Sequence, residues 1–89
     1  MHTVYIELNG MVQGVGMRFF IAQRAKRYGI KGFVRNRRDG SVECLAQGNE
    51  KDVEAFMEAL KKESPGNITD FHATPTSPTE PHNSFDIRH

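Results

Sequence analysis

Three glycines within seven residues, followed by an arginine, are the residues of this sequence that best suit chemistry. They occupy residues 10–16, between an alternating apolar segment and a helix-like one. Glycine permits positive φ, so successive backbone N–H groups can converge and the main chain can approach a ligand closely. The first N–H groups of a helix lack internal partners, and the helix dipole favours an anion there. Arg18 adds a planar fork that matches phosphate oxygens. The segment is therefore predicted to bind a small anion.

Neither of two common nucleotide-binding loops accounts for these glycines. A Walker A loop requires Gly-Lys-Ser/Thr, and no such triplet follows. A dinucleotide fingerprint requires a further glycine after Gly14 and Gly16, but residues 17–19 are Met, Arg and Phe. The spacing alone leaves two interpretations open, an anion-binding loop and a simple connecting turn.

A second segment places an asparagine where its residue type is unfavourable. Residues 32–37 are predicted to form a strand, and Asp39-Gly40 is a hairpin signal, so Asn36 lies inside the strand. Asparagine is unfavourable inside a strand, so its presence at this position needs an explanation. Its amide could serve a site, because the oxygen accepts a hydrogen bond while the nitrogen donates one. An ordinary turn-forming asparagine is the alternative.

Three segments together resemble the acylphosphatase family. They are residues 12–18 (Val-Gln-Gly-Val-Gly-Met-Arg), residues 32–36 (Gly-Phe-Val-Arg-Asn) and residues 39–43 (Asp-Gly-Ser-Val-Glu). Residues 85–88 also resemble the family's last strand, so the resemblance covers nearly the whole chain. Met17 and Phe33 depart from the family pattern, where an aromatic residue and a tryptophan are frequent, but both remain large and apolar.

The resemblance implies an enzyme, an acid anhydride hydrolase that converts an acyl phosphate to a carboxylate and inorganic phosphate. It implies that Arg18 binds the substrate phosphate and that Asn36 orients the attacking water. Backbone N–H groups would cradle the phosphate, and the residues that supply them are Gln13, Gly14, Val15, Gly16, Met17 and Arg18. Side-chain identity is expected to matter little in this cradle, apart from the two glycines and the arginine.

Hydrolysis of an acyl phosphate is compatible with a site that has so few catalytic side chains. Its leaving group is a carboxylate, which departs without a proton, and phosphoryl transfer depends mostly on positioning and charge stabilisation. No cofactor or metal is implied, because the four histidines are dispersed without zinc-like spacing. They are interpreted as surface residues, and Cys44 as a small packing residue. Inorganic phosphate is expected as product and competitive inhibitor.

Hydrophobic periodicity predicts the elements that must position these residues. Alternation predicts strands at residues 3–8, 41–47 and 84–87, and the β-forming Phe33 and Val34 predict one at 32–37. A further strand is predicted at 68–74, where the alternation is poor. Helical stripes predict a helix over 17–28, ended by Gly29, and a second helix capped by Asn49. Residues 74–83, with three prolines, are predicted to form a surface loop. The order is that of an α+β, ferredoxin-like fold, with two helices on one face of an antiparallel sheet of four or five strands.

Bulk properties narrow the class of protein. A chain of 89 residues suits one domain spanning residues 1–89. The net charge of +1 argues against a general nucleic-acid or membrane binder. The single cysteine suits a reducing cytosol, and there is neither a leader-like segment nor a run of about 18 apolar residues. The expected protein is a cytoplasmic monomer with a small-molecule substrate and no nucleic-acid or membrane partner.

Three other functions stay open on the sequence. One is a non-catalytic anion-binding or regulatory domain, since acylphosphatase-like domains also occur within larger maturation proteins. Another is an RNA-binding module of the same fold, because residues 31–34 resemble the start of an RNP1 motif, although Asn36 and Arg37 break it. The third is a phosphatase acting on esters, which would need a general acid that the sequence does not place. The physiological acyl phosphate and the acyl-side pocket are not marked by any motif.

Overall fold

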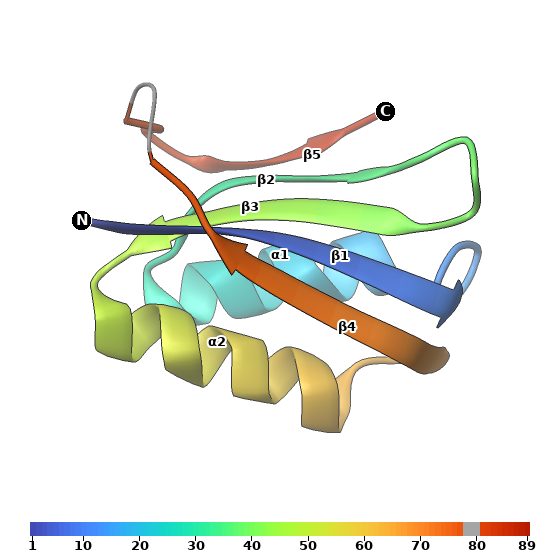
Figure 1. The fold of residues 1–89 in the computed structure, drawn as a ribbon. Helices are drawn as coiled ribbons and strands as arrows, with labels where there is room; N and C mark the ends of the chain where they lie inside the picture. Colours follow the sequence, from blue (N-terminus) through green and yellow to red (C-terminus); the bar gives the residue numbers. More distant parts are fainter. Residues whose placement is uncertain (78–80) are drawn as a thin grey trace.

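The computed structural model describes residues 1–77 and 81–89, which form two helices on one face of a five-stranded sheet (Figure 1). The described strands are β1 (His2–Met11), β2 (Lys31–Asn36), β3 (Val42–Gly48), β4 (Asn67–Pro75) and β5 (Phe85–Arg88). The helices are α1 (Met17–Tyr28) and α2 (Glu50–Glu63). This order confirms the predicted ferredoxin-like α+β fold.

The strands follow the order β4-β1-β3-β2-β5 across the sheet. The central strands β1 and β3 pair antiparallel from His2↔Gly48 to Leu8↔Val42, and β4 and β2 pair antiparallel on either side. The last strand, β5, instead lies parallel to β2. The sheet is therefore mixed, whereas the sequence predicted an antiparallel one. Alternation in a strand of four residues carries no information about its direction.

The core lies between the sheet and the helices. The predicted inward faces of β1 and β3 are buried, and their residues are Val4, Ile6, Leu8, Val42, Cys44 and Ala46. They meet the helical stripes, whose fully buried members include Met17, Ile21, Val53, Phe56 and Leu60. Burial of these side chains drives the packing of both helices onto the same face.

Three of the predicted helix ends are confirmed by the structure. Gly29 follows α1 at φ 70°, and the next N–H, of Ile30, donates to the carbonyl of Ala25 at 2.8 Å. Asn49 caps α2, because its side-chain oxygen accepts from the N–H of Asp52 at 2.9 Å. Ser64 ends α2, at the start of the predicted Ser-Pro-Gly-Asn stop.

The loop predicted over residues 74–83 begins later than predicted, because β4 extends to Pro75. The N–H of the next residue, Thr76, also donates to the carbonyl of Thr3 at 2.9 Å. Residues 78–80 of that prediction lie outside the described residues. In the part of the chain that the structure describes, neither helix is long and apolar enough to cross a membrane.

Candidate active site

The connection between β1 and α1, residues 12–16, is called the glycine loop below. Gly14 and Gly16 adopt φ of 74° and 80°, in the left-handed region that the sequence predicted for them. A Cβ added to either would meet no heavy atom within 4 Å, so the backbone conformation, and not crowding, requires glycine there. Gly10 differs, because it lies in β1 at a register shift and a Cβ on it would clash with the carbonyl of Asn67.

The positive end of α1 opens onto this loop. Gly16 is the N-cap residue and provides no side-chain cap, and the first turn of α1 holds no acidic residue. The one charged side chain in that turn is Arg18. Unpaired N–H groups and a helix dipole favour an anion at this position, and a cation alone is disfavoured there.

The Gln13 side chain ties the glycine loop to the β2–β3 hairpin. Its Nε2 donates to the carbonyl of Arg37 at 2.7 Å and to the carbonyl of Ser41 at 2.8 Å. The sequence treated Gln13 only as a source of a backbone N–H, and these two side-chain hydrogen bonds were not predicted. No pattern in the sequence signals these bonds, because they join segments that are far apart along the chain.

The hairpin turn that receives Gln13 is itself closed by hydrogen bonds. The Oδ1 atom of Asp39 accepts from the Ser41 hydroxyl at 2.6 Å and from the Ser41 N–H at 2.9 Å. These two hydrogen bonds hold the pKa of Asp39 below its usual value, and the bond from the Ser41 hydroxyl has the larger effect. The Arg37 N–H also donates to the carbonyl of Ser41 at 2.8 Å. These hydrogen bonds fix the conformation of the hairpin turn to which the Gln13 side chain is bonded.

Asn36 is the last residue of β2 and pairs with Val42 of β3, so its predicted place inside the strand is confirmed. Its side-chain Oδ1 is buried and has no hydrogen-bond partner in the structure. Most buried polar atoms are hydrogen-bonded, so an unpartnered acceptor of this kind calls for an explanation.

Arg18 reaches across to the end of β5. Its Nη1 donates to the carbonyl of Arg88 at 3.2 Å and lies 3.2 Å from Nδ1 of His89. Arg88 pairs with Arg35 of β2, which is the residue before Asn36. The sequence predicted His89 as a plain surface residue, and its contact with Arg18 was not foreseen because no short-range pattern links the two.

These contacts bring the predicted site residues to one end of the sheet. Gln13 connects the glycine loop to Arg37, the neighbour of Asn36, and Arg18 connects α1 to β5 beside β2. Figure 1 shows the start of α1 and the β2–β3 hairpin on the same side of the molecule. The arrangement thus places the glycine loop, the Arg18 guanidinium and the buried Asn36 oxygen at the same end of the sheet.

The remaining candidates lie elsewhere. Cys44 is fully buried in β3, and burial raises the pKa of its thiol, which fits the predicted packing role. The His82 ring lies tilted against the Phe33 ring, with centroids 6.0 Å apart. Within residues 1–77 and 81–89, the His, Cys, Asp and Glu side chains form no group of three or more that could hold a metal ion.

Comparisons with known proteins find similarity to one enzyme family over most of the chain. Residues 4–87 match the family model described as acylphosphatase. The acylphosphatase of Bacillus subtilis (strain 168) is 42% identical over 83 residues, which are 92% of this chain and 91% of that protein. The crystal structure of acylphosphatase from Bacillus subtilis superposes with a TM-score of 0.95 at 40% identity and covers 100% of both chains.

A third similarity is to a much larger protein. The crystal structure of full-length HypF, in a phosphate- and nucleotide-bound form, superposes with a TM-score of 0.90 at 29% identity. The match covers 99% of this chain but 12% of that one. The fold thus also occurs as a small part of a longer chain. The family-model match and the Bacillus subtilis relative nevertheless span nearly all of the present sequence, and they confirm that this chain belongs to the acylphosphatase family of enzymes.

Proposed function

We propose that this chain hydrolyses acyl phosphates to a carboxylate and inorganic phosphate at the glycine loop. The observation that carries the proposal is the left-handed glycine loop leading into an uncapped helix end whose first turn holds Arg18 and no acidic residue. A phosphate seated there would meet backbone N–H groups, the positive end of the helix dipole and a guanidinium. The proposed cradle comprises the backbone N–H groups of residues 13–18.

Asn36 is proposed to orient the attacking water. Its buried Oδ1 has no partner within the protein, so it is available to accept a hydrogen bond from a water. Its place at the end of β2 is next to Arg37, whose carbonyl accepts from Gln13 at the start of the glycine loop. A water held by Asn36 would therefore lie close to a phosphate in that loop.

The reaction follows from these positions. The water oxygen bonds to phosphorus while the bond between phosphorus and the bridging acyl oxygen breaks. The electron pair leaves with the carboxylate, which needs no proton, and the water proton passes to an oxygen of the phosphate itself. Catalysis then consists of positioning and charge stabilisation, which the cradle, Arg18 and Asn36 supply without a metal. We further propose that the chain acts as one cytoplasmic, monomeric domain.

The test is hydrolysis of acetyl phosphate by the purified protein in the presence of EDTA, with p-nitrophenyl phosphate as the comparison substrate. We expect acetyl phosphate to be hydrolysed with competitive inhibition by inorganic phosphate, and the ester to be hydrolysed more slowly because p-nitrophenolate is a stronger base than a carboxylate and therefore a poorer leaving group. Similar rates on the two substrates would contradict the proposed mechanism, as would a requirement for a metal.

A second candidate function is a non-catalytic anion-binding domain. The similarity to a small part of HypF favours it, because there the same fold lies within a much longer protein. Turnover separates the two candidates. A binding domain would hold inorganic phosphate, detected by titration, yet release none from acetyl phosphate.

A further inference from the structure

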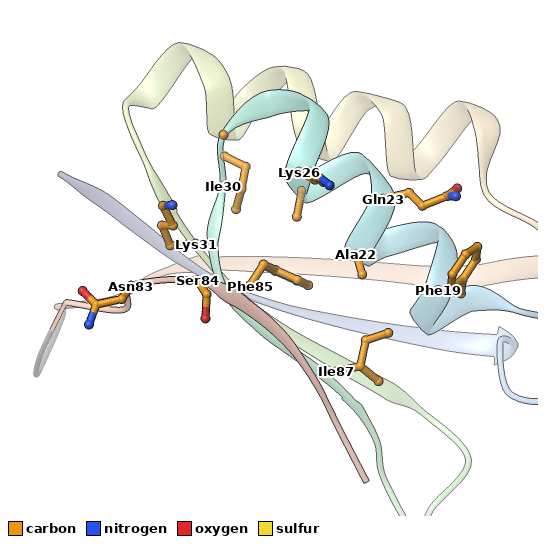
Figure 2. Close-up of a pocket in the computed structure, with 12 residues that line it drawn as sticks. Phe19, Ala22, Gln23, Lys26, Ile30, Lys31, Asn83, Ser84, Phe85 and Ile87 are labelled. Atoms are coloured by element: carbon orange, nitrogen blue, oxygen red, sulfur yellow. The ribbon is translucent and has the colours of Figure 1, made fainter.

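A groove of about 470 Å³ lies between α1 and β5, along one edge of the sheet (Figure 2). We propose that this groove receives the acyl group of the substrate and favours aromatic or extended apolar acyl groups over acetyl. The inference rests on the proposed function, since it requires the phosphate to lie in the glycine loop. Its volume lies within the roughly 300–1,000 Å³ typical of small-molecule pockets.

The groove begins beside Arg18. Phe19, which follows Arg18 on α1, lines one wall, and Ile87 of β5 lines the other. Ile87 precedes Arg88, whose carbonyl accepts the hydrogen bond from Arg18 at 3.2 Å. Figure 2 shows Phe19 and Ile87 toward the same end of the groove, where α1 starts. An acyl group is joined to its phosphate by a single oxygen, so it must leave the cradle along a nearby surface, and the groove wall starts at Phe19, one residue after Arg18.

The near end of the groove is apolar and exposed. Phe19 is 63% exposed and Ile87 is 37% exposed. In the described residues only four large hydrophobic side chains are exposed, and the other two are Met1 and Met11. Two of these four therefore border one groove at one end. Exposed apolar side chains gathered beside a polar site are typical of ligand-binding surfaces.

The side chains that line the groove differ between its two ends. Phe85 lies near its middle and is anchored to the core, since its ring packs against Phe56 with centroids 6.3 Å apart (Figure 2). Lys31, Asn83 and Ser84 line the far end. From Phe19 to Lys26 the helix rises about 10 Å, at about 1.5 Å per residue. A benzoyl group or a medium-length acyl chain would thus contact Phe19 and Ile87, on a stretch that Gln23 also lines, before it reached Lys31, Asn83 and Ser84.

Three other hollows among the described residues do not fit an acyl group. One is lined by Arg35, Arg37, Arg38 and Asp39, whose charges offer nothing to an uncharged chain. Another includes Met1, His2 and Gly48, which lie at the end of the sheet opposite to Asn36. A third lies at the start of α2, lined by Asn49, Glu50, Lys51 and Glu54. Of the four hollows compared, the α1–β5 groove is the one that combines apolar walls with a residue adjacent to Arg18.

The experiment compares kcat/KM for benzoyl phosphate with kcat/KM for acetyl phosphate. Phe19→Ser removes the apolar wall, and Ala22→Phe fills the groove from α1 without removing a contact made by the cradle. The matched control is Met11→Ser, because Met11 is 69% exposed and lies close to the glycine loop but outside the groove. The ratio of the two kcat/KM values does not depend on the fraction of folded enzyme.

We expect the benzoyl-to-acetyl ratio to fall at least about fivefold in Phe19→Ser and in Ala22→Phe, as loss of an apolar contact predicts, and to stay unchanged in Met11→Ser. An unchanged ratio in both groove variants, or an equal fall in Met11→Ser, would overturn the acyl groove. The proposed function fails differently, because the wild-type protein would then hydrolyse neither acyl phosphate.

Discussion

At the scale of single residues, two side chains of the candidate site lie in positions that lower the stability of the folded protein. Arg18 lies in the first turn of α1, where a cation is disfavoured by about 0.3–1 kcal/mol. The buried Oδ1 of Asn36 has no partner, and an unsatisfied buried group costs about 1–3 kcal/mol. Residues that break local rules are expected at functional sites, and an anion and a water would compensate both.

Asn36 and Asn49 give a matched pair for separating function from stability. We expect Asn36→Ala to lower kcat by about tenfold or more with little change in the phosphate inhibition constant, because it removes the water-orienting oxygen. Its free energy of unfolding should not fall, and should rise by up to about 1–3 kcal/mol, because the substitution removes a buried oxygen that has no partner. Asn49→Ala should instead lose about 1 kcal/mol of stability, because it removes the cap of α2, and keep full activity.

Steady-state kinetics and urea unfolding of both variants provide the measurement. If Asn36→Ala raised KM at constant kcat, Asn36 would bind the phosphate and not orient the water. If it destabilised the fold and left kcat intact, its role would be structural.

The residues that the sequence did not reveal are those that act through long-range contacts. Arg18 and Asn36 were predictable because each lies in a short motif and breaks a local preference. Nothing local marks the Gln13 side chain, which bonds two carbonyls of the β2–β3 hairpin, or His89, whose ring lies against Arg18. Their roles depend on which segments the fold brings together.

At the scale of elements, the site depends on glycines that serve two different purposes. Gly16 has a positive φ with open space around its missing Cβ, whereas a Cβ on Gly32 in β2 would clash with the carbonyl of Leu45. The first glycine shapes a loop, and the second permits close approach of neighbouring strands. Substitution of each by alanine therefore tests a different property.

We expect Gly16→Ala to remain folded with a loss of about 1–2 kcal/mol, the cost of a left-handed backbone with a Cβ, and to weaken inhibition by inorganic phosphate. Gly32→Ala should prevent folding or destabilise it far more, because the clash is with backbone atoms. Urea unfolding and the phosphate inhibition constant measure the two effects. Full phosphate affinity in Gly16→Ala would show that the loop conformation does not form the cradle.

Most elements were predictable because their hydrophobic periods are strong. The stripe of Val53, Phe56, Met57 and Leu60 predicted α2, and alternation predicted β1 and β3. The direction of β5 was not predictable, because pairing depends on where the chain returns after β4. That parallel strand forms one wall of the α1–β5 groove, so the acyl side of the site could not be inferred from local pattern either.

At the scale of the whole molecule, one core supports both helices and the site at the end of the sheet. Cys44 lies in the central part of that core on β3 and is fully buried. Its thiol reports on opening of the whole structure, because burial raises its pKa and the thiolate is the reactive form.

We expect Cys44 to react with an aromatic disulfide reagent only as fast as the protein unfolds. The mild alkaline pH that would ionise an exposed cysteine should not accelerate the reaction of the native protein beyond its unfolding rate. Inorganic phosphate should slow the labelling, because a ligand that binds only the folded state lowers the unfolded population. Labelling is followed by absorbance at increasing urea concentration. Rapid labelling of the native protein would contradict the described burial.

The central claim is that Arg18 and the glycine loop form a metal-independent site for acyl phosphate hydrolysis. The most direct measurement is the rate of benzoyl phosphate hydrolysis in EDTA by the wild-type protein and by Arg18→Ala, with circular dichroism to verify folding. We expect turnover by the wild type and a loss of about 100-fold or more in the variant, the scale of removing one charge-stabilising donor. A folded Arg18→Ala variant that retained the full rate would contradict it.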